Sequence, residues 1–446
     1  MQLVHLYLLP KPCVNALVMG FLGIFIGISV AQLLRAQETN HAADLDKFLS
    51  QGKFQESIDH FERITAANPE DHQARLAQGL SHFFLSLQHL GNSNYRYALI
   101  NNSLASRLPI ARLPIPDNPT PVELSYTTLR EIIENFHDDL ETAEVTLAKV
   151  DTSQVRLDFY LGKVRFDFNN DSRLDSEESL WCVAQTINRN AFGQSEITER
   201  LGNNFLIGVD GADVHWLRGY ANLLMFMCDC LLAYDQEELF LRCGQLLFPK
   251  ITSPYRTSKQ SRSIDPFAPE PIMDLIAAIH LMDFKVRAPE RLKSAHGHLL
   301  AMVRESRLCW KCAVTEEDNH FEWIPNPKQT GILSVKVSQE IITGWLNVLD
   351  EMEKLLNGEK LIPYWREYSR AYLNLSGENA QVPSKGLGIN LKKVFHEPRD
   401  FSLILAIQGT GVEPFLEEGD LSTPEAWQRM TNIFRGNFIG FAIWFN

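Results

Sequence analysis

The chain has 446 residues, of which 45% are hydrophobic and 22% charged, a composition typical of a globular protein with two or three domains. Its formal charge of -13 and its lack of basic runs argue against a nucleic-acid partner, because phosphate binding needs clustered Lys and Arg. An acidic chain of this kind suits cations better.

Residues 1–36 have the pattern of a targeting segment, with Lys11 followed by an apolar stretch from Val14 to Leu34. About 20 apolar residues can span a bilayer, whereas a shorter apolar core ending near Ala36 is typical of a cleaved signal peptide. Residues 1–36 are therefore either a signal peptide or an N-terminal membrane anchor. Either one predicts an exported protein in the periplasm, the cell envelope or the extracellular space, and only an uncleaved segment implies a membrane partner.

Apolar residues recur at helical spacing through residues 41–105, and part of this region resembles one tetratricopeptide repeat (TPR). In that family Gly52 would lie at the tight turn between two helices and Ser57 at a small-residue packing position. Phe61 would make the large inter-helix contact, and Pro69 would follow the second helix.

The resemblance covers only one repeat, and a further helix is predicted over residues 71–90. Arrays of this type usually need about three repeats to bury a continuous core. We therefore expect a TPR-like helical hairpin that packs on the next domain. The alternative is a repeat groove that binds a protein or peptide partner.

Five prolines make residues 106–123 a linker, and residues 124–446 then form a large helical domain. Its first helix ends near Val150. Further helices are predicted at residues 178–188, 213–234, 237–247, 271–283, 290–314, 338–357 and 424–434. Short strands are predicted at residues 155–161, 206–209, 402–408 and 438–445, where apolar and aromatic residues gather without helical spacing.

Residues 167–178 match the twelve-residue calcium loop of an EF-hand, which offers oxygen ligands at positions 1, 3, 5, 7, 9 and 12. Calcium prefers six to eight oxygens, and every one of these positions is filled. The predicted ligands are the side chains of Asp167, Asn169 and Asp171, the backbone carbonyl of Arg173, Asp175 directly or through water, and both carboxylate oxygens of Glu178.

Ser172 departs from the pattern, because position six of the loop is normally glycine. A serine in the left-handed conformation costs on the order of 1 kcal/mol, which would weaken binding about fivefold. We expect a dissociation constant of roughly 10⁻⁴ to 10⁻³ M, as in extracellular modules. Gly162 and the β-branched residues before the loop indicate an extended entering segment, so that only one helix flanks the loop.

The same residues have a simpler interpretation, in which Asp175 caps a helix and Glu178 completes a capping box. That interpretation leaves Asp167, Asn169 and Asp171 unexplained at alternating positions. EF-hand loops usually pair, and no second one is present in the sequence. The apolar run at residues 205–209 is a candidate substitute that would bridge to Leu174 at position eight, with Asp210 or Asp213 capping the next helix.

Other motifs carry weaker signals. Cys309 and Cys312 have the spacing of a redox pair but lie late in a helix, so two free thiols or a structural disulfide are the expected forms. Cys228-Asp229-Cys230 lacks the spacing of a zinc site. His296 and His298 are two residues apart on a predicted helix and are poor joint ligands, so we expect them on a solvated surface.

From about Pro121 to Asn446 the chain resembles a family of uncharacterised exported bacterial EF-hand proteins. The resemblance is carried by the loop, the Trp216–Tyr220 helix, the Trp323–Pro327 turn and the Gly436–Phe438 ending. It implies calcium binding and no particular reaction.

The sequence thus predicts a mainly α protein with a TPR-like hairpin, one calcium loop and a few short strands. We expect a non-enzymatic role, with Ca²⁺ as a structural clamp; the alternative is a cell-envelope hydrolase with a structural calcium site.

Overall fold

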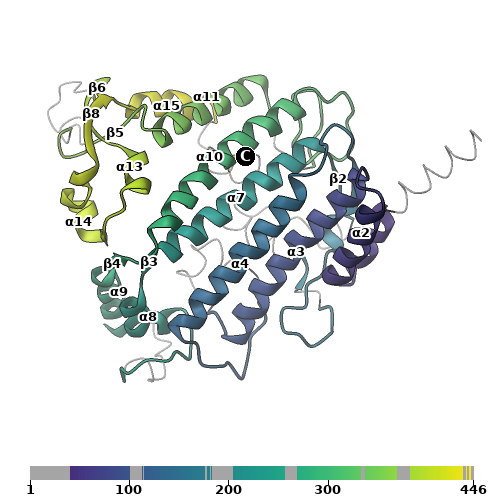
Figure 1. Cartoon of the computed structure of the whole chain (residues 1–446), viewed down its shortest axis with the longest axis horizontal. Coiled ribbons are helices and arrows are strands. Elements are labelled where there is room, and N and C mark those ends of the chain that lie inside the picture. The colour runs from purple at the N-terminus through teal and green to yellow at the C-terminus, as the bar shows by residue number, and fades with distance from the viewer. Residues whose placement is uncertain are drawn as a thin grey trace, which may run out of the picture.

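The computed structural model describes residues 41–100, 113, 115–175, 178–180, 182, 204–256, 269–332, 337–368, 382–434, 438 and 441–442. These residues form a mainly helical protein, as predicted (Figure 1). The predicted targeting segment and the predicted helix over 178–188 lie wholly or mostly outside them. Among the described residues, no helix is both long and apolar enough to cross a membrane.

Residues 41–50 are helical, and α2 (Phe54–Ala67) follows after a tight turn at Gly52, whose φ is +65°. This positive φ explains the glycine, since other residues pay a steric penalty there. α2 packs on α3 (His72–Arg96) through a hydrogen bond between the buried hydroxyls of Ser57 and Ser81. The helix over 41–50 and α2 thus form a helical hairpin. Its resemblance to a tetratricopeptide repeat and its binding of a peptide partner stay predictions.

Four long helices, α3, α4 (Tyr126–Leu147), α7 (Gly211–Ala233) and α10 (Pro289–Ala313), lie side by side in that order (Figure 1). Three of them begin at side-chain caps: Asp71 accepts from the Ala74 amide at the start of α3, Ser125 accepts from the Thr128 amide at the start of α4, and Asp210 forms a capping box with Asp213 at the start of α7. The predicted capping of α7 by Asp210 is confirmed. Caps of this kind accept hydrogen bonds from the first amides of a helix, which have no partner within the helix.

α7 contributes to two hydrophobic cores. The first is shared by α2, α3, α4 and the ribbon of β1 (Leu157–Tyr160) and β2 (Leu206–Val209). The second joins α7 and α10 to α11 (Gln339–Leu356) and includes the fully buried Trp310. α7 also carries buried polar side chains along its length, at Asp213, His215, Asn222 and Asp229. Polar groups in such a place need partners or ligands.

Shorter elements cover the ends of these helices. They are β3 (Tyr234–Asp235), α8 (Glu237–Cys243), α9 (Pro269–Leu281), β4 (Asp283–Val286), β5 (Ile362–Pro363), β6 (Lys385–Ile389), α13 (Leu391–His396), β7 (Phe401–Ser402), α14 (Leu403–Gln408), β8 (Leu416–Asp420) and α15 (Pro424–Asn432). The strands form the antiparallel sheets β3-β4-β7 and β5-β6-β8.

Two predicted strands are wrong. Residues 403–408 form the helix α14, and only Phe401 and Ser402 pair as a strand. In the predicted strand 438–445, the described residues 438, 441 and 442 are helical, and Phe441 stacks on Trp310. Short apolar runs fit a strand or a buried helix equally well, and packing decides between them.

Candidate functional site

The predicted calcium loop is entered by extended chain, as expected from its sequence. β1 leads through a short 3₁₀ turn, Leu161–Lys163, into the loop. The two ends of the loop are joined by an antiparallel bridge between Arg165 and Ser179, in which the Phe166 amide donates to the Glu178 carbonyl over 2.8 Å. This bridge brings the first and last predicted ligands close together.

The first three predicted side-chain ligands organise the turn of the loop. Asp167 accepts hydrogen bonds from the amides of Asp171 (3.0 Å) and Ser172 (3.1 Å). Asn169 accepts from the Asp171 amide (3.0 Å), and Asp171 accepts from the Arg173 amide (2.8 Å). Such contacts are typical of Asx turns and wrap the backbone around the Asp167 carboxylate.

Ser172 adopts the left-handed conformation that the loop requires, with φ of +62°, and Asn170 does so with φ of +56°. The strain expected at Ser172 is therefore present in the structure. Asparagine tolerates this conformation better than serine, so the strain is concentrated at one position of the turn.

Glu178 is fully buried, with 0% of its surface exposed. Its Oε1 accepts a hydrogen bond from the Phe168 amide over 2.9 Å, whereas its Oε2 is buried and has no hydrogen-bond partner among the described residues. Burial raises the pKa of this carboxyl, and the negative charge of Asp167 acts in the same direction, while the backbone amides of Phe168 and Asn169 act against it. Glu178 thus faces the start of the loop, whereas a capping box would turn its side chain back to Asp175.

The remaining predicted ligands lie on the surface. Arg173 and Asp175 are both exposed, and the Asp175 carbonyl accepts from the Glu178 amide over 3.1 Å. Three clusters of His and acidic side chains in the described part of the chain have ligand atoms within 4.8 Å of one another, and all of them lie outside this loop. The backbone bridge thus holds the two ends of the loop together, whereas Arg173 and Asp175 lie at its exposed edge.

α3 anchors the start of the loop. Asn92 donates from Nδ2 to the carbonyls of Asp167 (2.6 Å) and Phe168 (2.9 Å), and Gln88 accepts from the Asp167 amide (3.2 Å). The buried Phe168 ring lies directly over Gly91, where a Cβ would come within 2.1 Å of it. A fixed entry of this kind lowers the ordering cost of ligand binding.

The predicted bridge between residues 205–209 and Leu174 is wrong. β2 pairs with β1 in the register Leu157 to Val209, and Leu174 is 42% exposed, with its tip against Gly52. The loop therefore contacts the N-terminal hairpin. Just before the loop, the Arg165 amide also donates a hydrogen bond to the Leu49 carbonyl of the hairpin (3.0 Å).

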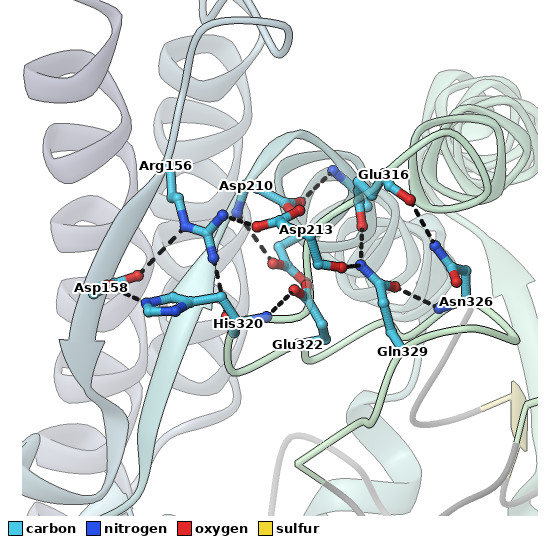
Figure 2. Close-up of polar contacts among 11 residues, drawn as sticks. Arg156, Asp158, Asp210, Asp213, Glu316, His320, Glu322, Asn326 and Gln329 are labelled. Atoms are coloured by element: carbon cyan, nitrogen blue, oxygen red, sulfur yellow. Dashed lines mark hydrogen bonds and ion pairs between the residues drawn. The ribbon is translucent and has the colours of Figure 1, made fainter.

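A group of acids from segments that are far apart in the sequence lies at the start of α7 (Figure 2). The acidic cluster consists of Asp210, Asp213, Glu316 and Glu322, and one oxygen each of Asp210, Glu316 and Glu322 lie within 4.8 Å of one another. Asp213 Oδ2 accepts from the Asp210 amide (3.1 Å), while its buried Oδ1 has no hydrogen-bond partner among the described residues.

Burial and mutual repulsion raise the pKa of every acid in this cluster. Burial, then the charge of Asp210, raises the pKa of Glu316 to about 8 and lifts that of Asp213 well above its usual range. Beside the cluster, Arg156 pairs with Asp318, and His320 Nε2 lies 2.8 Å from an Asp158 oxygen (Figure 2). Such a group can hold protons at neutral pH or bind a cation.

The surroundings of the cysteine motifs do not favour redox chemistry. Cys309 and Cys312 are free thiols, and burial raises the pKa of both, which disfavours the reactive thiolate. Cys228, Cys230 and Cys243 are also free, and the burial of Cys228 and Cys243 is typical of cysteines that act as small apolar residues.

No protein-family model, curated protein or solved structure matches this chain. The resemblance to exported EF-hand proteins therefore stays a prediction, and the function is argued from the geometry above.

Proposed function

We propose that residues 167–178 bind one Ca²⁺ ion and that the ion acts as a structural clamp in an exported, non-enzymatic protein. The observation that carries the proposal is Glu178, a fully buried carboxylate whose Oε2 has no hydrogen-bond partner among the described residues. Burying an unpaired charge is costly, and a cation bound by Asp167 and Glu178 would remove that cost. Glu178 is also the residue from which an EF-hand loop takes its bidentate ligand.

The contacts of the loop favour a clamp over a switch. The loop is held by Asn92 of α3, by the Arg165–Ser179 bridge and by the contact of Leu174 with Gly52. An ion that joins Asp167 to Glu178 would therefore tie three segments of the first core together. In this proposal Asn169, Asp171, the Arg173 carbonyl and Asp175 complete the oxygen set.

Thermal unfolding of the full-length chain with calcium and with chelator tests the proposal. Calcium at about 100 times its dissociation constant stabilises the folded state by about 2.7 kcal/mol. Glu178→Gln should abolish this response and, because it removes an unpaired buried charge, should raise the melting temperature in chelator. Glu70→Gln is the matched control, since the Glu70 side chain is 87% exposed and lies outside the loop. A melting temperature that is unchanged in all conditions would refute calcium binding.

A second candidate function is that of a cell-envelope hydrolase in which the loop calcium is structural. The observation that favours it is the close approach of Glu316 and Asp210, whose carboxylate oxygens lie within 4.8 Å of each other. Burial raises the pKa of Glu316 to about 8, and acids shifted toward neutral pH suit general acid catalysis. Screening ester, glycoside and peptide substrates with the native chain and with Glu316→Gln tests this function. Turnover that the substitution leaves unchanged would count against a role for the acidic cluster.

A further inference from the structure

Three side chains from three neighbouring helices converge between α4, α7 and α10. His137 of α4, Asp229 of α7 and His298 of α10 each offer a ligand atom, and these atoms lie within 4.8 Å of one another. We call this group the His-Asp-His site. His137 and Asp229 are buried, and His298 is partly buried, with its ring at an edge-to-face angle to that of His137.

The atoms of the site face one another without forming hydrogen bonds. His137 Nε2 lies 3.6 Å from Asp229 Oδ1, and His298 Nε2 lies 3.6 Å from Asp229 Oδ2. His137 Nε2 and Asp229 Oδ2 are both buried and have no hydrogen-bond partner among the described residues. Two buried polar atoms in this state are expensive to maintain, so their arrangement requires an explanation.

A second His–carboxylate pair between α7 and α10 serves as an internal comparison. There His215 Nδ1 and Glu305 Oε2 approach to 2.7 Å, and Arg218 and Arg304 complete the ion pairs of Glu305. The same two helices can therefore bring a histidine and a carboxylate into a hydrogen bond. The wider spacing at Asp229 is the one expected for ligands that surround an ion.

The outer nitrogens of both histidines are held by acceptors. His298 Nδ1 lies 2.9 Å from Asn222 Oδ1, and the orientation of this amide is fixed because Asn222 Nδ2 donates to the Arg218 carbonyl. His137 Nδ1 lies 3.3 Å from Asp138 Oδ1. Since each of these oxygens accepts a hydrogen bond from Nδ1–H, the neutral imidazole has its lone pair on Nε2, which is directed at the site. This is how outer partners usually orient metal-binding histidines.

The charges at the site are compatible with a divalent ion. Arg291 donates to Asp229 Oδ1 over 3.0 Å and also pairs with Glu134, which leaves Asp229 Oδ2 available. Glu134, Asp138, Glu141 and Glu144 of α4 supply further negative charge around the site.

We propose that His137, Asp229 and His298 bind a divalent transition-metal ion, for which Zn²⁺ is the probe. Zinc binds imidazole nitrogen at about 2.0 to 2.1 Å, so its tetrahedral ligands lie about 3.3 Å apart. His298 Nε2 lies 3.6 Å from Asp229 Oδ2, the oxygen that Arg291 leaves available, and the ligand atoms of all three residues lie within 4.8 Å of one another. A modest closure of the three side chains would therefore bring them to zinc-binding distances. Two imidazoles and one carboxylate suit zinc or iron better than calcium, and three protein ligands leave a fourth position for water or a substrate.

Zinc binding to the full-length chain, measured against a chelating indicator after metal removal, tests the proposal. His298→Gln should weaken the binding of one equivalent by at least about 100-fold, and Asn222→Ala, which removes only an outer partner, by about 10- to 100-fold. The matched control is His296→Gln on the same helix. His296 is buried too, but its Nε2 bonds to the Leu356 carbonyl and its Nδ1 to His396, so zinc affinity should not change.

Co²⁺ gives an independent readout, because its visible spectrum reports nitrogen coordination directly. The native chain and His296→Gln should give the same Co²⁺ spectrum, and His137→Gln should lose it. If His298→Gln does not fold, as judged by circular dichroism, His137→Gln and Asn222→Ala decide the question. Absence of a bound equivalent in the native chain, or equal zinc affinity in all variants, would overturn the proposal.

Discussion

Replacing Ser172 with glycine should strengthen calcium binding, because this residue carries the strain of the predicted calcium loop. Its φ of +62° lies in the left-handed region, which glycine enters without a Cβ penalty. The strain amounts to about 1 kcal/mol, and its relief corresponds to a roughly fivefold gain in affinity. Ser172 is exposed, so the substitution leaves no cavity behind.

Asn170→Gly is the matched control for this prediction. Asn170 has nearly the same φ, +56°, but asparagine tolerates the left-handed conformation, so little strain is available for release. Both variants add one glycine to the unfolded chain, and this entropic cost cancels when the two are compared. The comparison therefore isolates the conformational strain at Ser172.

Isothermal titration calorimetry of Ca²⁺ into the metal-free native chain and both variants measures the effect. We expect Ser172→Gly to bind about fivefold more tightly than Asn170→Gly. An affinity of Ser172→Gly that equals or falls below that of the control would refute the argument from strain. A loss of binding in both variants would instead show that the serine and asparagine side chains themselves hold the loop.

Two further predictions follow from packing and charge. Gly91→Ala should destabilise the fold by about 1 to 3 kcal/mol in denaturant unfolding and weaken calcium binding, because the new methyl group meets the Phe168 ring. The control is Gly297→Ala, which has open space around it and should be neutral or stabilising. The pKa of Glu316 rises on folding from 4.5 to about 8, so its contribution to stability is present at low pH and is lost as the pH rises through about 8. Glu316→Gln should thus be more stable than the native chain by about 1 to 2 kcal/mol near pH 9 and similar to it near pH 5, and a difference that does not grow with pH would contradict this.

The sequence by itself determined the local features of the protein. The loop proposed to bind calcium could be recognised as a candidate because all its proposed ligands lie within twelve consecutive residues, and the left-handed turn at Ser172 follows from the same spacing. The long helices followed from apolar periodicity, and the cap at Asp210 from its position before one of them. β1 and β2 were predicted as strands, but their pairing with each other was not.

The prediction that His296 and His298 lie on a solvated surface was wrong, for a reason that applies to the other polar sites as well. His296 is buried against the Leu356 carbonyl, while His298 turns toward Asp229 between the helices. Helical periodicity indicates which residues share a face, but the neighbour that covers the face is chosen by packing.

Only the tertiary structure decided which distant polar residues meet. His137, Asp229 and His298 come from three helices, and the acidic cluster joins the start of α7 to the chain after α10. Each of these residues is unremarkable in its own segment. Their chemistry arises when helix packing removes them from water together, because burial is what leaves Asp229 Oδ2 without a partner and raises the pKa of Glu316.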